Sequence, residues 1–181
     1  MPIYAFDGLK PRIGRGAYVH PDAVIIGDVE LGERASVWPT AVLRGDFGPI
    51  VVGARTSVQD GTVVHTTRAH PTRIGADCVV GHNAHLEGCV IEDHCLVGSM
   101  SMVLNRSVVG AHSVVAAGAL VTEGRHVPAR SMVSGVPGQV RPLEGEVHVG
   151  RIARGVDIYV ENALHYPDAL ELVAVEDCTS S

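Results

Sequence analysis

Residues 91–121 read IEDHCLVGSMSMVLNRSVVGAHSVVAAGALV, and this stretch decides the fold. An aliphatic residue returns every six positions, at Ile91, Val97, Val103, Val109, Val115 and Val121. The residue four positions after each of the first five is small: Cys95, Ser101, Ser107, Ser113 and Ala119. A period of six predicts a parallel β-solenoid, in which three hexads form one triangular coil of 18 residues.

The same pattern extends from about Ile13 to Val133, which predicts about six to seven coils. In each hexad the aliphatic side chain fills a narrow interior, and the small one lies where the chain turns a corner. Aromatic rings do not fit such an interior. This explains why the 181 residues are 46% hydrophobic but only 4% aromatic, with 21 glycines for the many turns.

The pattern divides the chain into a lead-in over 1–12, a solenoid domain over 13–141 and a C-terminal helical segment with its tail over 142–181. Apolar residues three to four positions apart over Arg151–His165 predict an α-helix. Tyr166-Pro167 is expected to interrupt it, and Asp168 to cap a short second segment, ALELVAV.

Two stretches break the six-residue register, Gly45–Ile50 (GDFGPI) and Thr66–Arg73 (TTRAHPTR), and a shorter slip occurs at Glu87–Val90. We expect the first two to be inserted loops. Loops on a regular scaffold are the usual place for functional residues.

Charge and composition exclude several classes of protein. A net charge of −6 argues against nucleic-acid binding, which needs a basic face. No apolar run approaches the length of a membrane span, and the first residues do not resemble a signal peptide. The four cysteines form no CxxC pair and indicate reduced thiols in a cytoplasmic chain. Cys78 and Cys95 occupy equivalent small positions in adjacent coils, where two thiols are favoured over a disulfide.

The register also places polar residues. Arg44, His65 and Glu87 each follow an inward aliphatic residue on the same face of consecutive coils, so they are expected to form one outward column. His82 falls near a corner on the neighbouring face. It does not easily reach the column of its own chain, but His82 of a neighbouring subunit can.

Five stretches of the sequence resemble the γ-class carbonic anhydrases and their close bacterial relatives. These are SVWP (36–39), VLRGD (42–46), VQDGTVVH (58–65), VGHNA (80–84) and VSGVPG (133–138). Hexapeptide acyltransferases share the repeat and the last stretch, but not this combination. The resemblance covers about Ile13 to Val140. It implies a left-handed β-helix with a C-terminal helix, and a homotrimer with a metal at each subunit interface.

In the family pattern the metal has three histidine ligands, two from one subunit and one from the next. His65 and His82 match the first two positions, and the third position holds Glu87. A glutamate is a competent zinc ligand, and two histidines with one carboxylate also suit Fe²⁺. The resemblance therefore implies Zn²⁺, with Fe²⁺ or Co²⁺ as alternatives. His85 is a displaced substitute ligand in a second interpretation, although its position is expected at a corner.

The resemblance assigns further roles around the metal. Gln59 orients the bound water or carbon dioxide, and Arg44, Asp46 and Asp60 form a charged cluster that assists the chemistry or holds the trimer together. Tyr159 and Asn162 either reach a neighbour's site or pack the helix.

The activity that the resemblance implies is the reversible hydration of carbon dioxide to bicarbonate by metal-bound hydroxide. A second hypothesis keeps the metal but gives it a larger substrate, such as an acyl thioester. A third is a protein without catalysis that binds or assembles, and a coenzyme A acyltransferase comes last.

Overall fold

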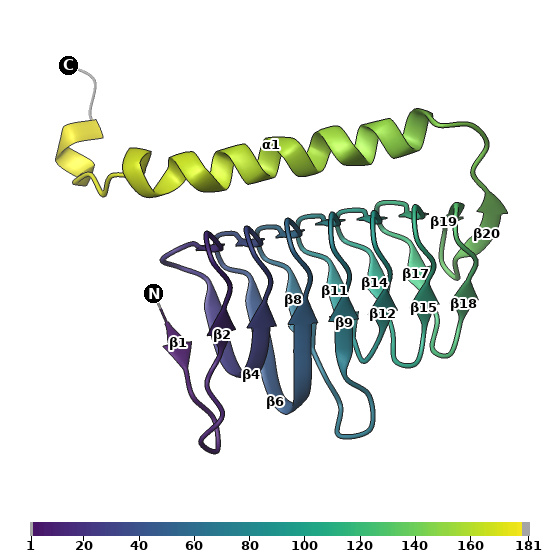
Figure 1. Ribbon diagram of the computed structural model, residues 1–181, viewed down its shortest axis with the longest axis horizontal. Coiled ribbons are helices and arrows are strands. Elements are labelled where there is room, and N and C mark those ends of the chain that lie inside the picture. Colours follow the sequence, from purple (N-terminus) through teal and green to yellow (C-terminus); the bar gives the residue numbers. More distant parts are fainter. Residues whose placement is uncertain (1, 179–181) are drawn as a thin grey trace.

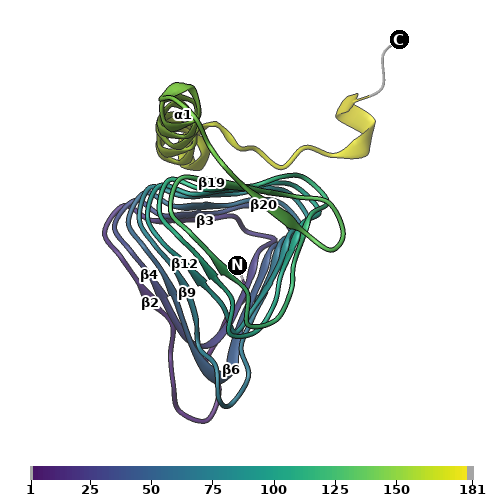
Figure 2. The same cartoon turned by 90° about the vertical axis from the view of Figure 1, so that its right-hand side faces the viewer.

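The structure, a computed structural model, describes residues 2–178. The chain forms a left-handed parallel β-helix of about 7 turns, followed by one long C-terminal helix. Figure 1 shows the coils stacked side by side with the helix α1 lying along them, and Figure 2 shows the triangular cross-section. The predicted fold is confirmed. Residues 179–181 of the predicted tail lie outside the described residues.

The face of the triangle beneath α1 is one continuous sheet. Its strands are β3 (Tyr18–Val19), β5 (Ser36–Val37), β7 (Ser57–Val58), β10 (Val79–Val80), β13 (Leu96–Val97), β16 (Val114–Val115) and β19 (Ser131–Ser134). They pair in parallel, and β20 (Gln139–Pro142) closes the sheet by pairing antiparallel with β19. We call this the helix face.

The other two faces share a second sheet, because two long strands run around the corner between them. These are β4 (Val24–Leu31) and β6 (Val42–Val52). One face, which we call the site face, continues with β8 (Val63–His65), β11 (His85–Glu87), β14 (Met102–Val103) and β17 (Leu120–Val121). The strand β1 (Ile3–Tyr4) pairs with the start of β4 on this face.

The third face begins with β2 (Arg12–Ile13), which pairs with the end of β4. It continues with β9 (Thr72–Ile74), β12 (Val90–Ile91), β15 (Val108–Val109) and β18 (His126–Val127). The slip that the sequence shows at Glu87–Val90 lies between β11 and β12, where Gly88 adopts φ +56°. Glycine suits this left-handed backbone because it has no side chain to clash.

The interior follows the predicted division between aliphatic and small side chains. Its core consists of Val, Ile, Leu, Ala and Cys side chains from successive coils. The hydroxyl groups of the fully buried Thr56 and Thr62 donate to the carbonyls of Gly75 and Gly81, at 2.6 and 2.9 Å. Because buried polar groups are costly without a partner, these bonds let threonine replace alanine at a corner.

Adjacent coils approach closely at the corners. A Cβ at Gly53 would lie 2.4 Å from the carbonyl carbon of Gly75 in the next coil, so a side chain there would force the backbones apart. Cys78, Cys89 and Cys95 are buried free thiols, as expected. The backbone N–H of Cys95 donates to the sulfur of Cys78 at 3.3 Å.

The two irregular stretches differ from each other. Gly45–Ile50 was expected to be an inserted loop, but it lies within the continuous strand β6, which pairs with β4 on both sides of a register shift. In the stretch Thr66–Arg73, residues 66–71 do form a loop, closed by mutual backbone hydrogen bonds of 3.2 Å between Thr67 and His70, and the last two residues belong to β9. Both protrude with the N-terminal hairpin at one corner of the triangle (Figure 2).

The helix α1 (Val147–Ala169) packs its apolar side on the helix face. Ile152, Val156 and Val160 are buried against Val79 and Val114. Because this apolar packing forms one continuous cluster along the solenoid, it attaches the helix to several coils.

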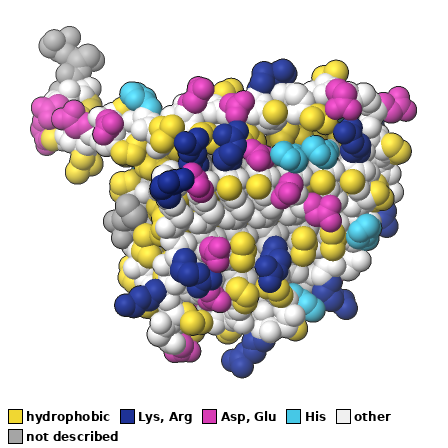
Figure 3. All heavy atoms as spheres, in the orientation of Figure 1, with side chains coloured by type: hydrophobic (Ala, Val, Ile, Leu, Met, Phe, Trp, Pro, Cys, Tyr) yellow, Lys and Arg dark blue, Asp and Glu magenta, His cyan; other side chains and the backbone are white. Residues whose placement is uncertain are grey.

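An ion pair adds to that attachment. Arg55 bonds to Asp77 on the solenoid and to Asp157 on α1, each at 2.7 Å. Basic, acidic and histidine side chains gather in a row along this edge below α1 (Figure 3).

The predicted interruption at Tyr166-Pro167 is wrong. The helix continues through Pro167 to Ala169, because the proline lies in the last turn and its effect is confined to that end. The predicted second helical segment is also wrong: residues 170–174 have no regular structure and precede a short 3₁₀ helix, η1 (Val175–Cys178). No helix within residues 2–178 combines the length and the apolar character needed to cross a membrane.

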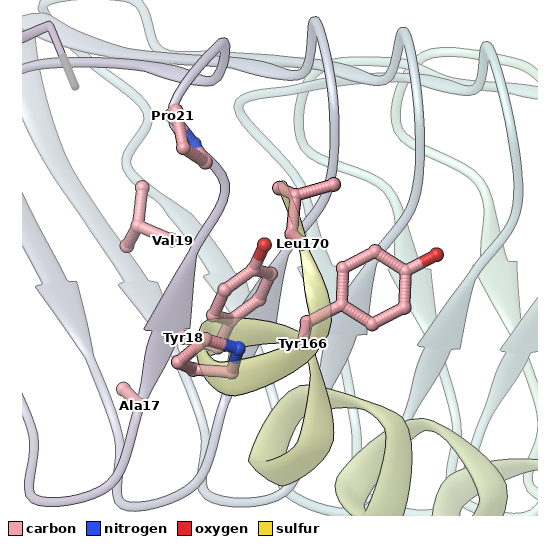
Figure 4. Close-up of a pocket in the computed structure, with 7 residues that line it drawn as sticks. Ala17, Tyr18, Val19, Pro21, Tyr166 and Leu170 are labelled. Carbon is pink, nitrogen blue, oxygen red and sulfur yellow. The ribbon is translucent and has the colours of Figure 1, made fainter. Parts of the chain in front are cut away.

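Aromatic rings excluded from the interior gather between the helix face and the end of α1. Trp38 lies 5.7 Å from Tyr159 and 4.9 Å from Tyr166, and Tyr18 lies 5.5 Å from Trp38. Within the chain, Tyr159 therefore packs α1 against the helix face, which is one of the two roles predicted for it. A hollow of about 360 Å³ remains beside this cluster, between the first coil and the last turn of α1 (Figure 4).

Candidate active site on the outward face of the solenoid

The predicted column forms on the site face. Arg44 in β6 is the register partner of His65 in β8, and His65 is the partner of Glu87 in β11. The inward Leu43, Val64 and Leu86 precede them and are fully buried. Since side chains alternate along a strand, the residues of the column must point outward.

Hydrogen bonds connect the column into one charged chain. Arg44 pairs with Asp46, and the other oxygen of Asp46 lies 3.1 Å from Nε2 of His65. Nδ1 of His65 lies 3.2 Å from Oε1 of Glu87, and Oε2 of Glu87 lies 3.4 Å from Nε2 of His85. Each carboxylate is thus held between two groups that can carry positive charge.

Burial differs along this chain of contacts. The side chains of Asp46 and His65 are only 14% and 12% exposed, against 26% for Glu87 and 35% for His85. Partial burial by itself raises the pKa of Asp46, but the hydrogen bonds from Arg44 and His65 outweigh it and hold this pKa below its usual value. Asp46 therefore stays ionised at neutral pH.

His85 was expected at a corner, and this is wrong. It lies in β11 as the register partner of Val63 and Met102, and it points outward two residues before Glu87. The sequence already contains the signal for this position. Side chains alternate along a strand, so the buried Leu86 implies that both His85 and Glu87 point outward.

The remaining predicted residues form a second cluster at the next corner. His82 lies in the turn between β10 and β11, and its Nδ1 is 2.7 Å from Oδ2 of Asp60. Gln59 follows β7 and is 4% exposed, in a groove that it shares with His82. Within one chain Asp60 thus pairs with His82, whereas Arg44 pairs with Asp46. The charged cluster that joins these residues across a subunit interface stays a prediction.

Each chain therefore carries two separate parts of the predicted metal site. Within residues 2–178 of one chain, no group of three or more His, Cys, Asp or Glu side chains is arranged to hold a metal. His65 and Glu87 are adjacent, whereas His82 belongs to the other cluster. The placement of His82 in a neighbouring subunit stays a prediction.

The donor chemistry fits a divalent metal. A metal-ligating histidine binds through one ring nitrogen and gives its other N–H to a carboxylate or carbonyl. His65 has a carboxylate at each ring nitrogen, so Asp46 can support the ring while Glu87 stands beside it as a second ligand. One imidazole with one carboxylate on paired strands is compatible with Zn²⁺, Fe²⁺ or Co²⁺.

Sequence reasoning named no role for Phe47 and Arg68, which lie against the site. The centroid of the Phe47 ring lies 5.7 Å from that of the His65 imidazole. The guanidinium carbon of Arg68 lies 5.6 Å from the same Phe47 centroid. The sequence signal that could have identified them is their position in the two stretches that break the six-residue register.

Comparisons with known proteins agree with the fold. Residues 10–45 and 71–105 match the family described as bacterial transferase hexapeptide (six repeats). The chain is 40% identical over 154 residues to the carnitine operon protein CaiE of Escherichia coli O157:H7, covering 84% of this chain and 79% of CaiE.

Two solved structures are also similar. A hexapeptide transferase family protein from Anaplasma phagocytophilum is 33% identical with a TM-score of 0.87, covering 91% of this chain and 98% of that one. A putative acetyltransferase from Bacillus cereus is 32% identical with a TM-score of 0.89, covering 93% and 98%. The chain therefore belongs to the hexapeptide-repeat transferase family, together with CaiE.

Proposed function

We propose that the chain is a subunit of a metal-dependent trimer that adds water to an electrophilic carbon, with the reversible hydration of carbon dioxide as the simplest such reaction. The observation that carries this proposal is the stacking of His65 on Glu87, with Asp46 bonded to the far side of the His65 ring. Catalytic zinc and non-haem iron sites commonly contain an imidazole that is held by one carboxylate and lies beside a second carboxylate, which serves as a ligand.

His65 and Glu87 of one subunit and His82 of the partner subunit would hold the metal. When bound, Zn²⁺, Fe²⁺ or Co²⁺ supplies a Lewis acid and makes water nucleophilic near neutral pH. Within each chain, Asp60 holds Nδ1 of His82, which leaves Nε2 free to act outside its own chain. The half-exposed position of His82 at a corner is consistent with that role.

Proteins of this family commonly form trimers. An apolar stripe supports an interface here: Val63 and Met102 on the site face are 38% and 50% exposed beside the column, and Met100 in the turn before β14 is 67% exposed. Val63 and Met102 are outward register partners of His85 on either side. We infer that a second subunit covers this stripe and brings its His82 to the column.

The other residues position and transfer protons. The ionised Asp46 accepts a hydrogen bond from His65 and fixes its ring, and Arg44 fixes Asp46. His85 lies beside Glu87, with its Nε2 3.4 Å from Oε2 of that carboxylate, so its imidazole can accept a proton released at the site. The amide of Gln59 orients a substrate oxygen by donating a hydrogen bond.

The test is a comparison of Glu87→His with Glu87→Gln. A carboxylate ligand reduces the Lewis acidity of the metal, so Glu87→His is expected to raise the rate of carbon dioxide hydration about tenfold at neutral pH. Glu87→Gln keeps the size but loses the charge, and it is expected to lower metal content. Stopped-flow hydration and elemental analysis give the two readouts.

The outcome against the proposal is equally definite. Protein purified and then incubated with Zn²⁺, Fe²⁺ or Co²⁺ should retain about one ion per chain, because a trimer would have one such site at each of its interfaces. Retention that does not depend on Glu87 or His65 would contradict the proposed site. If the metal binds but neither variant hydrates carbon dioxide, the proposed reaction would be the addition of water to a larger electrophile.

A second candidate function is acyl transfer, which the family description and the name of the Bacillus cereus relative suggest. The observation that favours it is a groove of about 380 Å³ along the corner, with Gln59 and His82 among its lining residues and Arg151 of α1 beside them. His82 with its Asp60 partner has the form of a general base. Thiol release from acetyl-coenzyme A by chelator-treated protein that requires an added primary amine to receive the acetyl group, and that is lost in Asp60→Asn, would favour this function over water addition.

A further inference from the structure

Three protruding segments form a cavity next to the proposed reaction centre. The N-terminal hairpin is closed by mutual backbone hydrogen bonds between Phe6 and Leu9, at 3.0 and 2.9 Å. The bend of β6 and the Thr66–Arg73 loop follow it along the same edge of the solenoid (Figures 1 and 2). Between them lies a hollow of about 310 Å³, lined by Phe6, Asp7, Asp46, Phe47 and Arg68.

The cavity is continuous with the site through Asp46. One oxygen of this carboxylate bonds to Nε2 of His65, while the residue also lines the cavity. Phe47 contacts the His65 ring and lines the same cavity. A molecule in the cavity therefore lies against two residues that contact His65.

Both phenylalanines of the chain line this cavity. Phe6 is 41% exposed and Phe47 is 48% exposed, whereas Tyr18 and Trp38 are buried in the cluster at the end of α1. Exposed rings around a hollow are characteristic of binding surfaces, because covering their apolar area on binding is favourable.

The charges of the cavity are unequally compensated. Asp46 is paired with Arg44 and His65. By contrast, neither Asp7 nor Arg68 has an ion-pair partner among residues 2–178, and the Arg68 guanidinium lies over the Phe47 ring. The cavity thus presents one uncompensated carboxylate and one uncompensated guanidinium on different segments.

We propose that this cavity recognises a small zwitterion, with a cationic ammonium group at one end and a carboxylate at the other. Arg68 binds the carboxylate, Asp7 binds the cation next to Phe6, and the apolar segment of the ligand lies against Phe6 and Phe47. The inference deepens the proposed function by giving the substrate class, and it rests on that function only in placing the reacting carbon near Asp46 and His65.

Equilibrium binding of three matched probes tests the proposal. Isothermal titration calorimetry compares 6-aminohexanoate with hexanoate, which lacks the cation, and with hexylammonium, which lacks the carboxylate. We expect the zwitterion to bind about three- to fivefold more tightly than either, since one exposed ion pair adds a modest amount. Equal affinities for the three probes, or no saturable binding of the zwitterion, would overturn the proposal.

Charge-neutral variants assign the two ends of the ligand. Asp7→Asn is expected to reduce the affinity for 6-aminohexanoate to that for hexanoate, and Arg68→Gln to that for hexylammonium. Asparagine suits the φ of +47° at position 7, so the first variant keeps the turn. Arg73→Gln, an exposed arginine on the third face, is the matched control and should bind like the parent. An affinity that is insensitive to Asp7→Asn or to Arg68→Gln contradicts the assignment.

The binding readout separates this inference from the proposed function. In His65→Asn, water addition is expected to be lost while 6-aminohexanoate still binds. If carbon dioxide hydration is observed but the zwitterion does not bind, this inference alone fails. If the zwitterion binds with the expected charge dependence and no hydration occurs, the proposed reaction alone fails.

Discussion

At the scale of single residues, Glu87 determines the character of the site. It lies between His65 and His85, with one oxygen toward each imidazole. A histidine at this position would place three imidazoles next to one another, with Asp46 as the nearby anion. The carboxylate instead gives each imidazole a hydrogen-bond acceptor. These contacts stabilise the side-chain orientations that the proposed metal would require.

Tyr18 provides a test of burial at the residue scale. Its hydroxyl is buried without a hydrogen-bond partner within the described range 2–178, beside the hollow shown in Figure 4. A buried hydroxyl without a partner is unfavourable, so Tyr18→Phe is expected to raise the free energy of unfolding by about 1 kcal/mol. Thermal or urea unfolding at pH 7 measures the change.

The same residue predicts a pH dependence. Burial, and then Tyr166 nearby, raise the pKa of Tyr18 above its ordinary value. The folded state therefore favours the neutral phenol, and the resulting stability is fully present below about pH 10 and lost as the pH rises through the raised pKa. Tyr18→Phe should unfold with a weaker alkaline dependence than the parent. A parent and a variant with identical profiles between pH 8 and 11 would contradict this.

At the scale of elements, most strands are too short to be stable alone. Strands such as β10 and β13 contain two residues each, and they persist because every coil pairs with the next. The helix α1 is a different case, since it is held to the solenoid by apolar side chains and the Arg55–Asp157 ion pair. Its attachment is therefore sensitive to single truncations.

Ile152 and Ile158 test that attachment as a matched pair. Ile152 is buried in α1 against the helix face, whereas Ile158 in the same helix is 54% exposed. Ile152→Ala is expected to destabilise the protein by about 2–5 kcal/mol, the usual cost of removing a buried isoleucine. Ile158→Ala should change stability by less than about 0.5 kcal/mol, as exposed substitutions do. Urea unfolding of both variants gives the comparison, and equal effects would show that α1 is not packed as described.

The elements also show which structure can be predicted from sequence. The two-residue strands and their inward residues follow from the hexad period, because one position in six must fill the interior. The continuation of β6 through Gly45–Ile50 depends on pairing with β4, a long-range contact that no local pattern contains. The packing of Tyr166, near the end of α1, against Trp38 is likewise a long-range contact that no local pattern contains.

At the scale of the whole molecule, the candidate site follows from stacking. The column of Arg44, His65 and Glu87 was predictable, because the six-residue register determines which residues of successive coils lie on the same face. The pairing of Asp60 with His82 was not predictable, because these two residues meet across a corner between coils. The cavity beside Asp46 was not predictable either, because it is lined by three segments that lie far apart in the sequence.

The proposed trimer gives the last prediction. Met102 is half exposed in the apolar stripe beside the column, and a lysine there would place a charge in a buried subunit interface, where it would have to be desolvated. Met102→Lys is therefore expected to convert the trimer to monomers and to lower metal content with it, because His82 of the partner subunit would be removed from the site.

Leu164→Lys is the matched control, since Leu164 is also more than half exposed but lies on α1, which packs on a different face. It should remain trimeric and retain the metal. Light scattering after size exclusion measures the mass, and elemental analysis measures the metal. A monomeric Met102→Lys protein with full metal content would show that one chain completes the site by itself, and a monomeric parent would contradict the interface on the site face.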